Sequence, residues 1–111
     1  MSNGEIAEIT VEELNTMMQS GNAPVILDVR EYFEFDLANI DGVLIPLGEL
    51  EMRIYEIEQH KEDDIVVHCR TGSRSAEAVA MLQGQGFRKV KNLTGGLNEW
   101  ARKIDSSLPV L

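Results

Sequence analysis

The sequence predicts an α/β fold, built from a small and largely parallel sheet with helices on both faces. Short β-branched apolar runs, such as Ile65 to His68, alternate with segments whose apolar residues recur at helical spacing. Such runs are typical of strands buried on both faces, and parallel strands are usually joined by helices. A length of 111 residues leaves no room for a second core, so we expect one domain over residues 1–111.

The first expected element is a helix from Val11 to Ser20. Thr10 and Glu13 fit a capping box, in which each side chain accepts a hydrogen bond from the other's backbone N–H group, and Gly21 ends the helical segment. The apolar run Pro24 to Val29 follows as a buried strand. This succession of a helix and a buried strand begins the alternation that an α/β sheet requires.

A second helix is expected from Leu47 to about His60. Its apolar side chains recur at helical spacing, and acidic side chains occupy the other faces, which we interpret as solvated surface. The charged segment Lys61 to Asp64 fits a surface loop. That loop leads into the strand Ile65 to His68.

The last third of the chain repeats the strand, loop and helix pattern. A tight loop after Cys69 leads into a helix whose apolar residues run from Ala76 to Leu82. The segment Lys89 to Leu93 alternates as a short strand, and Leu97 to Lys103 fits a last helix. We assign Gly95 and Gly96 to the turn between these two elements, and Trp100 to packing.

The composition excludes several classes of partner. With 43% hydrophobic and 26% charged residues, the chain has the composition of a soluble globular protein. No apolar run approaches the roughly 20 residues of a membrane helix, and the N-terminus shows no basic segment followed by an apolar one, so we expect a cytoplasmic protein. The net charge of −9 repels phosphate backbones and anionic lipids, so we expect neither nucleic acid nor membrane as a partner.

Cys69 is the only cysteine of the chain, which excludes an internal disulfide, a Cys-x-x-Cys redox pair and a cysteine-rich zinc site. The two histidines, His60 and His68, fall in different expected elements and are too few to form a metal site with this cysteine. We therefore expect no metal and no other cofactor. His68 is expected to be a packing or hydrogen-bonding residue at the end of its strand.

The loop that begins at Cys69 carries the chemistry. It follows the carboxyl end of a strand, where α/β sheets bind ligands, and it opens a helix whose unpaired N–H groups and dipole favour a thiolate. Gly72 allows the loop amides to point inward as an anion-binding nest. Arg70 and Arg74 add positive charge, which also lowers the pKa of a thiol.

The hydroxyl groups of Thr71, Ser73 and Ser75 add hydrogen-bond donors to this loop, and Ser75 also fits the cap of the following helix. The alternative is that Cys69 is merely a small buried apolar side chain at the end of a strand. The strand, the glycine-centred loop, the two arginines and the helix start occur together. This combination favours a reactive cysteine.

Four segments resemble the signatures of rhodanese-like domains, in the order in which that family carries them. The segment Val67 to Ser75 resembles the active-site loop with its Cys-x-x-Gly-x-Arg pattern. The others are Ile26 to Glu31, Ile40 to Leu47, and Gly95-Gly96-x-x-x-Trp100. The resemblance extends over nearly the whole chain and implies the rhodanese-like fold, a small mostly parallel sheet of about five strands with helices on both faces.

The resemblance also implies a single-domain sulfurtransferase. Cys69 is then the residue that becomes a persulfide, and the backbone of Arg70 to Arg74 holds the transferred sulfur. The implied donor is thiosulfate or a protein persulfide, and the implied acceptor is cyanide, a thiol or a partner protein. Asp28 and Arg30 match family positions near the site, although a charge pair that ties a strand end to a neighbouring loop accounts for them equally well.

Two alternative functions stay open at this point. A binding or regulatory module could keep the fold without turnover, although the retention of Cys69, Gly72 and Arg74 argues against this. A cysteine phosphatase or arsenate reductase is the enzymatic alternative, because His68-Cys69 followed by Arg74-Ser75 resembles the His-Cys-x5-Arg-Ser/Thr signature of tyrosine phosphatases. Here the loop is one residue shorter, which suits a single sulfur atom better than a phosphoryl group.

Overall fold

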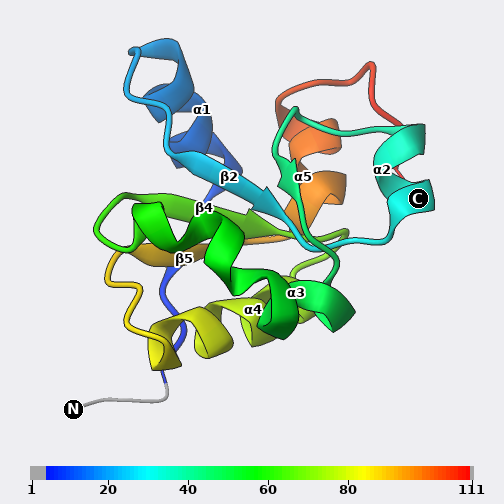
Figure 1. Cartoon of the computed structure of the whole chain (residues 1–111). Helices are drawn as coiled ribbons and strands as arrows, with labels where there is room; N and C mark the ends of the chain where they lie inside the picture. Colours follow the sequence, from blue (N-terminus) through cyan, green and yellow to red (C-terminus); the bar gives the residue numbers. More distant parts are fainter. Residues whose placement is uncertain (1–4, 111) are drawn as a thin grey trace.

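The computed structural model describes residues 5–110, which form one sheet with helices on both sides (Figure 1). The strands are β1 (Glu8–Ile9), β2 (Val25–Asp28), β3 (Val43–Leu44), β4 (Ile65–His68) and β5 (Val90–Leu93). The helices are α1 (Val11–Gln19), α2 (Tyr32–Leu37), α3 (Leu47–Arg53), the 3-10 helix η1 (Ile54–His60), α4 (Ser73–Gly84) and α5 (Gly96–Lys103). The sheet has five strands in the order β1-β5-β4-β2-β3, and each neighbouring pair is parallel. The predicted α/β class is confirmed.

The central strand β4 is buried on both faces, as its apolar sequence predicts. Successive side chains of a strand point to opposite faces of the sheet. Ile65 and Val67 accordingly lie in one hydrophobic cluster, and Val66 lies in another. Burial of such a side chain stabilises the fold by about 1.5–3 kcal/mol. Both faces of the sheet thus fix the strand that ends immediately before Cys69.

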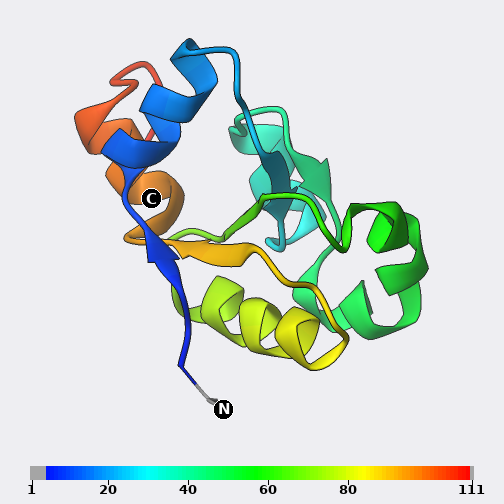
Figure 2. The same ribbon diagram turned by 90° about the vertical axis from the view of Figure 1, so that its left-hand side faces the viewer.

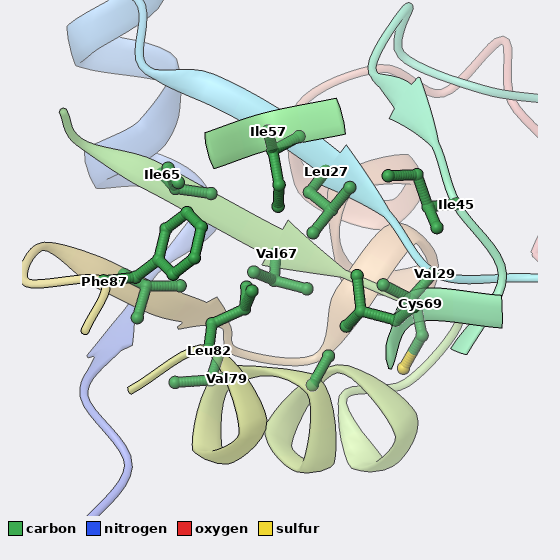
Figure 3. Close-up of a cluster of buried hydrophobic side chains, with 13 residues drawn as sticks. Leu27, Val29, Ile45, Ile57, Ile65, Val67, Cys69, Val79, Leu82 and Phe87 are labelled. Atoms are coloured by element: carbon green, nitrogen blue, oxygen red, sulfur yellow. The ribbon is translucent and has the colours of Figure 1, made fainter. Parts of the chain in front are cut away.

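Helices α3, η1 and α4 cover one face of the sheet, and α1 and α5 cover the other (Figures 1 and 2). The cluster of Ile65 and Val67, the first cluster, also contains Leu50, Ile57 and Leu82 from α3, η1 and α4, together with Cys69 (Figure 3). The cluster of Val66, the second cluster, contains Trp100 in the packing role expected from the sequence. None of the helices in residues 5–110 is long and apolar enough to cross a membrane.

Helix α1 begins as predicted. The hydroxyl of Thr10 accepts a hydrogen bond from the Glu13 N–H group at 3.1 Å, and the Glu13 carboxylate accepts one from the Thr10 N–H group at 2.9 Å. The helix ends at Gln19, one residue before the expected end at Ser20. The capping box is therefore confirmed.

The prediction of a single helix from Leu47 to His60 is wrong, because α3 ends at Arg53 and the chain continues as the 3-10 helix η1. Arg53 has φ −111° and ψ 10°, outside the α-helical region. A 3-10 helix has three residues per turn, so Ile54 and Ile57 lie one above the other and both pack on the first cluster. The apolar spacing of three in this segment fits the tighter helix as well as an α-helix.

Three elements were not predicted, namely β1, α2 and β3. The strands β1 and β3 are two residues long, which is too short to show an alternating pattern. In α2 the large apolar side chains Tyr32, Phe33 and Leu37 are exposed, and the buried side chain is that of Glu34. Because its apolar residues do not face the core, α2 lacks the amphipathic pattern on which helix prediction depends.

Candidate active site

Cys69 lies at the carboxyl end of β4, in the loop that leads into α4 (Figure 3). Its Sγ atom accepts hydrogen bonds from the N–H groups of Gly72 at 3.1 Å and Ser75 at 3.4 Å, and it contacts the Ser75 hydroxyl at 3.3 Å. Gly72 has φ 114°, a conformation that favours glycine. This backbone geometry forms the cradle of inward-pointing amides that the sequence predicts around the sulfur.

Hydrogen bonds in the cradle change the pKa of the Cys69 thiol more than burial does. Burial raises this pKa, whereas hydrogen bonds from the Ser75 hydroxyl and from the amides of Ser75, Gly72 and Thr71 lower it. The second effect is larger, so the pKa lies below its ordinary value. The side chain is only 1% exposed. The site therefore favours the thiolate, which is the form of a cysteine that acts as a nucleophile.

Helix α5 holds the same loop from the opposite side. The N–H group of Leu97 donates to the carbonyl oxygen of Cys69 at 2.9 Å, and that of Asn98 donates to the carbonyl oxygen of Arg70 at 3.0 Å. A Cβ atom at Gly96 would lie 2.6 Å from both carbonyl oxygens. The Gly95-Gly96 turn thus has a more specific role than turn geometry, because it lets the start of α5 approach the active-site loop.

Arg74 stands beside the loop, but its guanidinium group is engaged by a carboxylate. Its Nη1 and Nη2 atoms donate to the two oxygens of Glu34 at 2.7 and 3.0 Å. The hydrogen bonds from Arg74 outweigh the effect of burial and lower the pKa of Glu34 to about 2. The positive charge that the sequence places near the sulfur at Arg74 is therefore largely neutralised.

Asp28 and Arg30 form a fully buried ion pair, with 2.8 Å between Nη2 and Oδ2. Arg30 also donates to the carbonyl oxygens of Ala38 at 2.7 Å and Glu34 at 3.3 Å. These contacts tie the end of β2 to the middle and the C-terminal end of α2. The geometry is that of the structural charge pair considered from the sequence, and it positions the helix that carries Glu34.

His68 is fully buried at the end of β4, in the packing position expected from the sequence. Its Nδ1 atom lies 3.4 Å from the carbonyl oxygen of Cys69, and its Nε2 atom lies 3.6 Å from Oδ2 of Asp28 without a hydrogen bond. Burial outweighs the attraction of Asp28 and lowers the pKa of His68, which favours the neutral imidazole. Among the described residues, no group of three or more His, Cys, Asp or Glu side chains could hold a metal ion.

Ser75 is not the helix cap expected from the sequence. Helix α4 begins at Ser73 with Gly72 at the N-cap, so Ser75 is its third residue and points inward. There its Oγ atom donates to Oδ1 of Asn92 at 2.5 Å. The other loop residues with expected roles, Arg70, Thr71 and Ser73, have exposed side chains.

Two further residues, Glu34 and Asn92, contact this site and were not predicted from the sequence. An acidic residue in the weakly patterned segment of α2 gives no local sign that it pairs with an arginine 40 residues further along the chain. Asn92 stands within an otherwise apolar strand end, and a polar residue among buried positions was the signal available there. Both side chains belong to elements that only the folded chain brings next to the cysteine loop.

A parallel sheet that presents a thiol in a cradle of backbone amides at the end of its central strand is the arrangement of a rhodanese-like domain. The chain belongs to the rhodanese-like domain family, whose model matches residues 10–103. This match includes the active-site loop and the three other signatures found in the sequence. The predicted family and the rhodanese-like fold are confirmed.

Several similar proteins are named as sulfur carriers or sulfurtransferases. The putative sulfur carrier protein YrkF of Bacillus subtilis (strain 168) is 40% identical over 101 residues, which cover 90% of this chain and 54% of that protein. A sulfurtransferase of Allochromatium vinosum is 35% identical over 98 residues, which cover 87% of this chain and 90% of that protein. The structure of human single-domain sulfurtransferase TSTD1 matches with a TM-score of 0.75 and 26% identity, covering 89% of this chain and 98% of that structure.

The chain thus spans about half the length of YrkF and nearly all of the sulfurtransferase from Allochromatium vinosum. Relatives of sulfurtransferase type support a transferase activity. The expectation of one domain over residues 1–111 stays a prediction.

Proposed function

We propose that this chain is a sulfurtransferase in which Cys69 accepts a sulfane sulfur as a persulfide and passes it to an acceptor. The observation that carries this proposal is the set of donors around the Cys69 sulfur. Two backbone N–H groups donate to the buried Cys69 sulfur at 3.1 and 3.4 Å at the start of a helix, and the Ser75 hydroxyl lies 3.3 Å from it. Such an arrangement stabilises the Cys69 thiolate before it attacks the donor and again when the acceptor has removed the outer sulfur.

The proposed reaction balances without an oxidant or a reductant. The Cys69 thiolate attacks the outer sulfur of the donor, and the donor's S–S bond breaks so that its electron pair leaves with sulfite or with a thiolate. Cys69 then carries the outer sulfur as a persulfide anion. A second nucleophile attacks this outer sulfur, and the electron pair of the broken S–S bond returns to Cys69 as a thiolate.

The donor class is thiosulfate or a protein persulfide, and the acceptor is cyanide, a thiol or a partner protein. The sulfur carrier and sulfurtransferase names of two relatives support a partner protein on at least one side of the reaction. With a single cysteine in the chain, the persulfide has no second thiol with which to form an internal disulfide. We place the reaction in the cytoplasm, where lone thiols stay reduced.

The test is the intact mass of the protein before and after treatment with thiosulfate, and again after cyanide. We expect a gain of one sulfur atom, its removal by cyanide, and the release of thiocyanate. The Cys69→Ser variant should gain no sulfur, and a variant that still gained sulfur would contradict the site assignment. A wild-type protein with a reduced thiol that gained no sulfur from thiosulfate or from glutathione persulfide would favour a binding or regulatory module instead.

A further inference from the structure

The hydroxyl group of Ser75 lies between two acceptors but carries a single proton. Its Oγ atom is 3.3 Å from the Cys69 sulfur and donates to Oδ1 of Asn92 at 2.5 Å. Ser75 is fully buried and Asn92 is only 4% exposed, so bulk water does not offer a replacement donor. The Ser75 proton therefore serves the sulfur or the amide oxygen, but not both at once.

The orientation of the Asn92 amide is fixed by its other contacts. Its Nδ2 atom donates to the carbonyl oxygen of Gly72 at 3.1 Å and to Oε2 of Glu8 at 3.1 Å. An amide turned by half a rotation would place its oxygen against these two acceptors. The Oδ1 atom therefore stays directed at Ser75.

We propose that Asn92 is a positioning residue that competes with the Cys69 sulfur for the hydroxyl proton of Ser75. In the thiol form all groups are satisfied, because the thiol donates to Ser75 Oγ and the hydroxyl donates to Asn92. In the thiolate form the hydroxyl turns to the charged sulfur, which leaves Oδ1 of Asn92 buried without a donor. An unsatisfied buried acceptor is costly, so Asn92 disfavours the thiolate.

A consequence for sulfur loading rests on the proposed function. When Cys69 becomes a persulfide, the negative charge moves to the outer sulfur and the bonded Sγ atom no longer carries it. The Ser75 hydroxyl can then return its proton to Asn92. The same competition that disfavours the free thiolate thus favours the loaded form over it.

The charged and titratable groups around the cysteine come from several elements, and all of them are kept when Asn92 alone is changed. They are His68, Arg70 and Arg74 from β4, the loop and α4, Glu34 from α2, Asp28 and Arg30 at the end of β2, and Glu8 from β1. Among them Glu8 loses its hydrogen bond from Asn92 but keeps the one from the Thr94 hydroxyl. A shift in the titration of Cys69 in such a variant therefore reports the loss of the amide.

The first test is the pH dependence of Cys69 alkylation by iodoacetamide in the Asn92→Val variant. Valine suits a strand and cannot accept a hydrogen bond. With the competing acceptor gone, the midpoint of the profile should fall by about 0.5–1 pH unit, the size of one hydrogen bond. A merely structural role predicts the opposite sign, because loss of the contact to Gly72 would loosen the cradle and raise the midpoint.

The control is a double-mutant cycle with Ser75→Ala, since the proposed effect passes through the Ser75 hydroxyl. Adding Asn92→Val to the Ser75→Ala protein should leave the midpoint unchanged. A shift of equal size in both backgrounds, or a rise in the single variant, would overturn the proposal. If the valine variant does not fold, Asn92→Ala in the same cycle gives the same decision.

A second measurement tests the loaded state. At a fixed ratio of thiosulfate to sulfite, and at a pH above both midpoints, the ratio of loaded to free protein measured by intact mass should be about three- to tenfold lower in Asn92→Val. An unchanged or higher ratio would overturn the consequence for loading. A wild-type protein that takes up no sulfur contradicts the proposed function, whereas the alkylation midpoints still decide the role of Asn92.

Discussion

At the scale of single residues, the site depends on side chains whose charges and hydrogen-bonding groups are paired with those of other side chains. Glu34 is the clearest case, because it is buried yet ionised through two hydrogen bonds from Arg74. No local pattern in the sequence shows this pairing, since it joins α2 to the start of α4. The cysteine loop, by contrast, could be predicted from its own residues because its donors are backbone amides whose direction follows from Gly72 and the helix start.

Glu34 should make the stability of the fold depend on acid pH. Its pKa in the folded protein is about 2, against an ordinary value of 4.5, so its contribution is fully present above 4.5 and is lost as the pH falls toward 2. The shift corresponds to at most about 3 kcal/mol, and the 31% exposure of the Arg74 side chain reduces this to about 1–2 kcal/mol.

Urea unfolding of the wild type and Glu34→Gln checks this expectation. At pH 7 the variant should be less stable by about 1–2 kcal/mol, and the difference should shrink steadily below pH 4.5. A difference that stayed constant from pH 7 to pH 3 would show that the carboxylate acts through packing alone.

At the scale of elements, the site is a loop held between the first turns of two helices. The start of α4 supplies N–H groups to the sulfur, and the start of α5 supplies N–H groups to the loop carbonyls. The sequence predicts both helices, but it does not reveal that the second lies against the loop. The sequence also misplaces Ser75 as a cap, because serine is common at caps, whereas the helix begins two residues earlier, directly after Gly72.

Gly96 should be the position at which this clamp is most sensitive. Alanine there would bring a Cβ atom within 2.6 Å of backbone atoms of Cys69 and Arg70, in a conformation with φ 62°. Backbone atoms cannot move aside as a flexible side chain does, so we expect Gly96→Ala to lose about 3 kcal/mol or more of unfolding free energy. Urea unfolding measures the loss.

The matched control for this change is Gly48→Ala, since a Cβ atom at Gly48 meets nothing within 4 Å and the residue lies in helix α3. Alanine favours a helix, so this variant should be as stable as the wild type or more stable by up to about 1 kcal/mol. Equal losses in the two variants would contradict the clamp.

The connection between β2 and α2 depends on the buried pair of Asp28 and Arg30. Truncation of Arg30 would leave a fully buried carboxylate without its partner and remove the donor of two carbonyl oxygens. We expect Arg30→Ala to lose about 3–5 kcal/mol of unfolding free energy. Replacing both partners, as in Asp28→Leu with Arg30→Met, should recover part of this loss. If Arg30→Ala alone had an unfolding free energy near that of the wild type, the pair would not be what holds α2.

At the scale of the whole molecule, the alternation of elements predicts the α/β class, because β2 and β4 contain apolar runs that pack on both faces of the sheet. The strand order does not follow from the same pattern. The strands at the two edges, β1 and β3, are two residues long and pair along only two positions each, so their place is decided by what the helices and loops leave open. The contacts of Asn92 with Ser75 and of Glu34 with Arg74, next to the cysteine loop, likewise join segments that are distant in the sequence.

The net charge of the molecule predicts how the rate of sulfur uptake from thiosulfate depends on salt. A chain with a formal charge of −9 repels a dianion such as thiosulfate, and near the sulfur the charge of Arg74 is already balanced by Glu34. Raising the ionic strength from about 0.01 M to about 0.15 M shortens the screening length from about 30 Å to about 8 Å. The second-order rate of sulfur uptake from thiosulfate should therefore rise with salt, whereas alkylation by neutral iodoacetamide should not change. A rate that instead fell with salt would mean that the local positive charge of the Arg70 side chain and the loop amides governs the approach of the donor.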